Sequence, residues 1–118
     1  MDDDNLDLHV ATRSEAGVTV VSVRGEVDAA SVPLLEPPLR EAIGRGAPLV
    51  LDLVDCEFVD STGLHTIIEA SSELERLGLG FALACVPQGP VARVVEVALP
   101  GVLDLRASAA EAVAALAG

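Results

Sequence analysis

The segment of this sequence best suited to chemistry is Asp60-Ser61-Thr62-Gly63, where two hydroxyls follow a carboxylate. A hydroxyl in such a place can act as a nucleophile, accept a phosphate or cap a helix. An apolar stretch precedes the segment and a helical pattern follows it, so we expect a helix to begin there. Helix N-termini favour anions, because their first N–H groups are unpaired and the dipole is positive. A phosphate on Ser61 would therefore leave the helix folded and would add negative charge beside Asp60.

The alternative of a catalytic serine has less support in the sequence. The Gly-x-Ser-x-Gly turn of serine hydrolases needs glycine two residues before the nucleophile, and that position holds Val59. His65 is four residues after Ser61, one helical turn away, and is the nearest base that an enzyme could use. Phosphate-binding glycine motifs and clusters with metal-ligand spacing are absent from the sequence. We therefore expect no catalytic residues, no cofactor and no metal.

The amino-acid composition limits which classes of partner the protein can bind and indicates the cell compartment in which it works. Nineteen Asp and Glu against seven Lys and Arg give a net charge of −12, which disfavours nucleic acid. The start of the chain is acidic and no apolar run could span a bilayer, so we expect a cytoplasmic protein without membrane insertion. The 51% of hydrophobic residues predict one globular domain over residues 1–118, with 1–5 frayed. Cys56 and Cys85 lie in apolar stretches, and we interpret both as core residues without a disulfide.

The elements that must position Ser61 are visible as apolar patterns. Alternation over residues 6–10 and the β-branched run 18–23 predict two strands, joined by a turn at 14–17 into an antiparallel hairpin. Further strands are predicted from apolar runs at 49–54, 79–86 and 102–105. Helices are predicted over about 31–43, about 62–77, from Pro90 to about residue 98, and after a capping box that begins at Ser108.

This order of elements predicts an α/β fold. Its sheet would be mixed, with four to five strands, and about four helices would pack mainly on one face. The pair Pro37-Pro38 interrupts the first helical pattern. Because proline removes a hydrogen bond from a helix interior, we expect either a kink or a helix that begins at Pro37.

Three stretches together resemble the STAS domain family, in particular its stand-alone bacterial anti-sigma factor antagonists. Gly25-Glu26-Val27-Asp28 is similar to the family's G-E-[LV]-D strand end. The apolar run 49–53 leads to Asp60-Ser61-Thr62-Gly63-Leu64, which is similar to the family's D-[ST]-[ST]-G-L. Residues 87–105 resemble its third helix and the strand that follows. The resemblance covers nearly the whole chain, and it implies a STAS-like fold.

The resemblance also implies a switch between partners. In this family the unphosphorylated antagonist binds an anti-sigma factor that is also a serine kinase, and this binding frees the sigma factor. The kinase then phosphorylates the serine that follows the motif aspartate, and a PP2C-type phosphatase reverses the reaction. Carried over, Ser61 would accept the phosphate, with Asp60 shaping the loop and Asp28 lying nearby.

We assign three further positions to partner binding, two that the resemblance implies and one that departs from the family. Thr62 would be a weaker phosphate acceptor, and we expect it to serve as a helix cap. Gly63, which lacks a Cβ, would let a partner's backbone approach closely. His65 departs from the family, in which many relatives have a small residue, and it would present a bulkier, titratable group to a partner, although we favour its interpretation as a solvated helix residue.

Two other functions stay open at this stage. One is a STAS module that serves as an accessory or regulatory part of a transporter or larger signalling complex. The other is an enzyme that uses Ser61 with His65. The chain contains only two aromatic residues, both Phe, so we expect partner binding to use aliphatic contacts and the charge around Asp28, Asp60 and Ser61.

Overall fold

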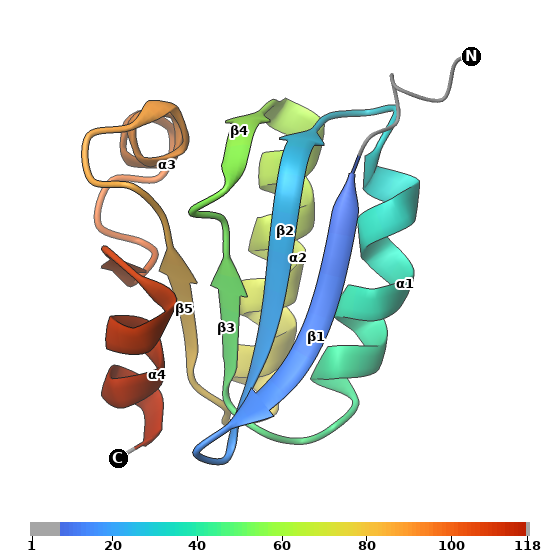
Figure 1. Cartoon of the computed structure of the whole chain (residues 1–118), viewed down its shortest axis with the longest axis vertical. Helices are drawn as coiled ribbons and strands as arrows, with labels where there is room; N and C mark the ends of the chain where they lie inside the picture. Colours follow the sequence, from blue (N-terminus) through green and yellow to red (C-terminus); the bar gives the residue numbers. More distant parts are fainter. Residues whose placement is uncertain (1–7, 118) are drawn as a thin grey trace.

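The structure, a computed structural model, describes residues 8–117 and consists of a mixed sheet with helices on both faces (Figure 1). One strand pair is antiparallel, β1 with β2, and the other described pairs are parallel. The strands are β1 (His9–Glu15), β2 (Val18–Val27), β3 (Leu49–Asp52), β4 (Cys56–Val59), β5 (Phe81–Ala84) and β6 (Leu105–Arg106). The helices are α1 (Val32–Ile43), α2 (Ser61–Arg76), α3 (Pro90–Ala98) and α4 (Ala109–Ala117). These elements confirm the predicted α/β class.

A tight turn joins the hairpin of β1 and β2. Ala16 and Gly17 both have positive φ, 52° and 81°, as the two-residue turns that match the twist of paired strands require. This short turn lets β1 continue to Glu15, so the observed strand covers residues 9–15 and not the predicted 6–10. The turn itself has two residues, so the predicted turn at 14–17 is too long. Leu8 is buried, whereas Leu6 lies outside the described residues.

The sheet has six strands among the described residues, more than the four to five predicted. The extra strand is β4, which was not predicted from the sequence. Both β3 and β4 pair with β2, first at Thr19–Ser22 and then at Gly25–Val27. A shift of register lies at Gly25, where φ is +117°. β4 thus extends the sheet beyond β3 and carries the chain to the start of α2.

Alternation along β2 sends its side chains into two cores. Val21 and Val23 join the larger core with residues of α1, α2 and α3, and Val18 and Val20 join a smaller one under α4. Figure 1 shows α1 and α2 behind the sheet and α4 in front of it. Three of the four helices share the larger core, which confirms that they pack mainly on one face. None of the helices in residues 8–117 is long and apolar enough to cross a membrane.

The Pro37-Pro38 pair lies inside α1, which runs as one helix from Val32 to Ile43. The expectation of a start at Pro37 is therefore wrong. Leu35 and Leu39 face the core, while Pro37 is exposed and Pro38 half-buried on the outer side. The carbonyls that lose a helical donor to the two prolines are those of residues 33 and 34, which are also exposed, so water can replace the missing bonds.

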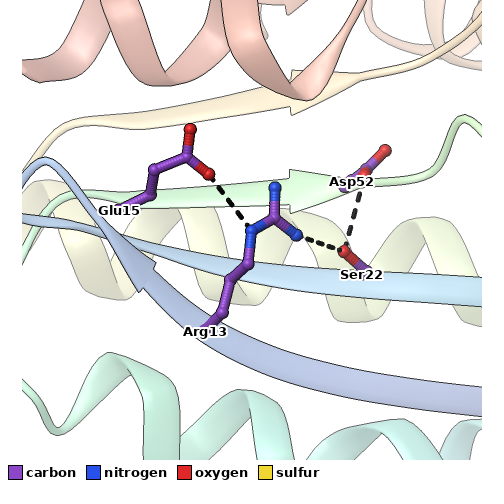
Figure 2. A network of polar contacts seen from close by, with 4 residues as sticks. All are labelled: Arg13, Glu15, Ser22 and Asp52. Atoms are coloured by element: carbon purple, nitrogen blue, oxygen red, sulfur yellow. Dashed lines mark hydrogen bonds and ion pairs between the residues drawn. The ribbon is translucent and has the colours of Figure 1, made fainter.

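A polar network joins three strands on the α4 side of the sheet (Figure 2). Arg13 of β1 donates to Ser22 Oγ of β2 at 3.2 Å, and Ser22 Oγ donates to Asp52 Oδ2 of β3 at 3.4 Å. Arg13 also donates to Glu15 at 3.1 Å. The arginine and Glu15 are exposed, so their ion pair contributes only ~0–1 kcal/mol. We interpret this network as part of the sheet's surface, because it stands apart from the turn that carries Ser61.

Candidate phosphoacceptor site

The start of α2 is built around Asp60. Its carboxylate accepts a hydrogen bond from the N–H of Gly63 at 3.0 Å, and its carbonyl accepts one from Leu64 at 2.9 Å. Neither bond uses the N–H groups of Ser61 or Thr62, which lie in the first turn, where helical partners are missing. Both hydroxyl side chains belong to exposed residues. The N-cap is therefore Asp60, and the expectation that Thr62 is the cap is wrong.

Gly63 has a different role from the one we expected. It is buried, and a Cβ added there would lie 2.7 Å from Cγ1 of Val27 and 2.9 Å from Cγ1 of Val59. Real Cβ atoms do not approach side chains so closely, so glycine lets the first turn of α2 rest directly on β2 and β4. The missing side chain serves contact within the chain, a role that we had not predicted from the sequence.

Asp28 shapes the turn before α1 and lies three residues ahead of Ser31, the N-cap of that helix. Its carboxylate accepts hydrogen bonds from the N–H groups of Ala30 at 3.0 Å and Ser31 at 2.9 Å. The hydroxyl of Ser31 in turn donates to the carbonyl of Glu26 at 2.7 Å and accepts from the N–H of Asp28 at 3.0 Å. Ser31 is buried. This role of Ser31 was not predicted from the sequence, because its hydroxyl bonds back to Asp28 and Glu26 and does not cap the first N–H groups of α1.

The two turns belong to neighbouring strands. Val27 of β2 pairs in register with Val59 of β4, and the N–H of Asp60 donates to the Val27 carbonyl at 3.1 Å. Asp28 and Asp60 directly follow this pair, so both helix starts lie at the same end of the sheet (Figure 1). Residues 26–32 and 57–66 contain four acidic residues and neither Lys nor Arg. The site therefore offers exposed hydroxyls among negative charges.

His65 is an exposed residue of the first part of α2. Its Nε2 lies 3.1 Å from Oε2 of Glu69 in the next turn, and 71% of its side chain is accessible. No hydrogen bond joins His65 to Ser61 in the part of the chain that the structure describes. The geometry thus gives no support to a Ser–His pair, and the imidazole is part of the surface around Ser61.

Phe58 is a second feature that the sequence analysis did not single out. It lies in β4 two residues before Asp60, and it is 44% exposed, whereas its neighbour Val59 is buried. Because side chains of a strand alternate between faces, the sequence could have predicted one residue inward and the other outward. An aromatic side chain is therefore exposed two residues before Asp60, and it could add to the aliphatic contacts and charge that we expect partner binding to use.

The two cysteines are free and buried, as predicted. Burial raises the pKa of both thiols, so they stay protonated and unreactive at neutral pH. Cys56, in β4, also donates a weak hydrogen bond to the carbonyl of Phe58 at 3.4 Å. Within residues 8–117, His, Cys, Asp and Glu side chains form no group of three placed to hold a metal ion.

Comparison with known proteins places the chain in a family. Residues 9–112 match the STAS domain, which is most of the chain, so the protein belongs to the STAS domain family. This confirms the resemblance to the STAS domain family.

Curated relatives carry a more specific name. The chain is 34% identical over 91 residues to anti-sigma-F factor antagonist RsfB of Mycobacterium tuberculosis, covering 76% of this chain and 70% of RsfB. It is 24% identical over 102 residues to the anti-sigma-B factor antagonist of Bacillus subtilis, covering 86% and 94%. The crystal structure of an anti-sigma factor antagonist from Mycobacterium paratuberculosis superposes with a TM-score of 0.84 at 26% identity, covering 95% of this chain and 96% of that one. Homologues of this chain are thus anti-sigma factor antagonists by name.

Proposed function

We propose that this protein is an anti-sigma factor antagonist whose binding to its partner is switched off by phosphorylation of Ser61. In its unphosphorylated state it binds an anti-sigma factor in the cytoplasm and so releases a sigma factor. The names of its homologues support this class of function. The choice of Ser61 as the phosphorylated residue depends on the structure at the start of α2. Ser61 is an exposed hydroxyl at the first position of a helix whose cap and packing are supplied by Asp60 and Gly63.

We also propose that the anti-sigma factor is the kinase. Transfer would form a bond from Ser61 Oγ to the γ-phosphorus of ATP, break the bond to ADP and release the hydroxyl proton. A PP2C-type phosphatase would return Ser61 by hydrolysis. The chain itself would contribute no catalytic group and would act as the substrate and binding partner.

The charge around Ser61 explains how a phosphate would end binding. Phosphorylation adds about 1.5 to 2 negative charges at neutral pH. The cap is already occupied by Asp60, and the surrounding segments contain Glu26, Asp28 and Glu57 but no Lys or Arg. No Lys or Arg in these segments would therefore be available to pair with the phosphate. The added charge would face the partner, where a buried unpaired charge opposes association.

Binding to the anti-sigma factor of the same organism tests this function. Ser61→Ala should bind as the natural chain does, whereas Ser61→Asp should lose about 2–5 kcal/mol of binding free energy. Ser14→Asp adds the same charge in β1, next to the hairpin turn and away from this end of the sheet, and should bind normally. With ATP present, the natural chain should take up one phosphate and Ser61→Ala none. Equal binding by Ser61→Asp and the natural chain would contradict the proposal.

A further inference from the structure

A second surface feature lies between α1 and α2 and takes no part in the turn at Ser61. The two helices leave a hollow of about 500 Å³ on the side of the molecule away from the sheet. In α1 its lining residues include Glu36, Leu39 and Arg40, and in α2 they include Glu69, Ala70 and Leu77. With Ile43 in α1 and with Thr66 and Glu73 in α2, the lining residues recur at spacings of three and four along each helix, so two facing stripes form one groove.

The groove has an apolar floor. Leu39 and Ala70 are buried at its base together with Thr66, whose hydroxyl donates to the carbonyl of Thr62 within α2. Leu77 stands at the end of α2 with 45% of its surface exposed, and Ile43 is half-buried opposite. The stripe from Thr66 to Leu77 runs for about 16 Å along α2. That length matches about three turns of a helix laid into the groove.

The rim of the groove is acidic. Glu36, Glu69 and Glu73 line it, with Arg40 as the cation among the lining residues. Glu36 and Arg40 make no ion pair among the described residues, and Glu69 is paired only with the exposed His65. Glu73 is paired with Arg76, which does not line the groove, so Glu36 is the rim carboxylate without an ion pair among the described residues. An apolar floor between carboxylates is the complement of a helix that carries apolar residues on one face and basic residues along its sides.

We propose that the α1–α2 groove binds a basic amphipathic helix of a partner protein. A second copy of this chain fits less well, because its own surface is acidic, with 19 Asp and Glu against 7 Arg and no Lys. Two such surfaces would bring carboxylates together at the rim. The groove does not include Ser61, so the proposal goes beyond the switch and stands whether or not Ser61 is phosphorylated.

Nuclear magnetic resonance on the full chain, with a synthetic peptide as probe, tests this proposal. The peptide would be a helix of about 14 residues with leucines on one face and arginines on both flanks, and its twin would carry glutamates in place of the arginines. The arginine peptide should shift the amide signals of the facing sides of α1 and α2, and the glutamate peptide should shift none. Shifts spread over the acidic surface, or centred elsewhere, would overturn the proposal.

Matched variants distinguish binding in the groove from nonspecific attraction of the peptide to the acidic surface. Glu36→Gln with Glu69→Gln should weaken peptide binding about fivefold, since two exposed charge pairs are lost. Glu41→Gln with Glu75→Gln removes the same charge from the same helices outside the groove, and should change binding less than about twofold. Equal effects of the two double variants would overturn the proposal.

The apolar floor has its own pair of variants. Leu77→Gln should weaken binding, whereas Leu34→Gln, on the outer side of α1 at 44% exposure, should not. Both leucines are about equally exposed, so the two changes should cost similar stability. If groove signals instead shift with protein concentration before any peptide is added, a second copy is the occupant and the proposal is wrong.

Discussion

Val27 and Val59 pair in register at the carboxyl ends of two parallel strands, and each is followed directly by an aspartate whose carboxylate accepts hydrogen bonds from backbone N–H groups in the turn that leads to a helix. This pairing brings the turns after β2 and β4 to one end of the sheet. Asp28 and Ser31 hold the first turn, and Asp60 with Gly63 holds the second. Ser61 is thus presented by a rigid framework.

The first prediction concerns the contact of α2 with this pair of strands. Gly63→Ala should destabilise the fold by about 1–3 kcal/mol, because its Cβ would overlap Val27 and Val59. Alanine normally stabilises a helix relative to glycine by about 1 kcal/mol, so a loss would be due to the clash. Urea unfolding measures the change.

Gly44→Ala is the control for this prediction. Gly44 ends α1 with helical φ, and a Cβ there would come no closer than 3.4 Å to a backbone oxygen. We expect that variant to be as stable as the natural chain or slightly more so. A Gly63→Ala protein as stable as Gly44→Ala would contradict the packing that we describe.

The cap of α2 gives the second prediction. Asp60→Ala should lower the free energy of unfolding by about 0.5–2 kcal/mol, because the N–H of Gly63 loses its acceptor. Asp60→Asn keeps an oxygen in place and should lose much less. Hydrogen exchange at the Gly63 amide should quicken in the alanine variant and stay slow in the asparagine variant. Similar exchange in both would show that the carboxylate is not the cap.

Phe58 leads to the third prediction. Phe58→Thr should weaken binding to the anti-sigma factor about tenfold, as loss of an aromatic anchor does, with little change in stability since the ring is half-exposed. Threonine keeps the β-branched character suited to a strand. Val97→Thr, at a more exposed position on α3, should bind normally. Titration calorimetry measures both, and unchanged binding by Phe58→Thr would place the ring outside the interface.

The buried thiols give a prediction at alkaline pH. Burial raises the pKa of Cys56 and Cys85 in the folded chain above the ordinary thiol value of about 8.5. Their contribution to stability is fully present below the ordinary value and is lost as pH rises through the folded values, because the unfolded chain then releases protons more readily. The free energy of unfolding should therefore fall above about pH 8.5.

The composition leaves few other groups that titrate in this pH range. The chain has no Tyr, and its seven basic residues are all Arg, which stay protonated. Only the thiols titrate between about pH 9 and 11, because the terminal amine has lost its proton by then. A Cys56→Ala, Cys85→Ala variant should show little fall in stability over that range. An equally steep fall in that variant would contradict the assignment.

Several parts of the fold and site were predictable because they depend on local patterns. The start of α2 near Ser61, the run of Pro90 into α3 and the cap at Ser108 all follow from residues close in sequence. β4 was missed because Cys56–Val59 is short, and its place in the sheet depends on pairing with β2, some 30 residues earlier. The role of Gly63 was missed for the same reason, because the close contact that requires glycine there is with Val27, which is distant in sequence.

The most direct test of the proposed function is mass spectrometry of the protein taken from its native cells. The intact chain should occur both unmodified and with one added phosphate, and peptide mapping should place that phosphate on Ser61. Ser61→Ala from the same cells should carry none. A phosphate on Thr62 or any other residue, with Ser61 unmodified, would contradict the account.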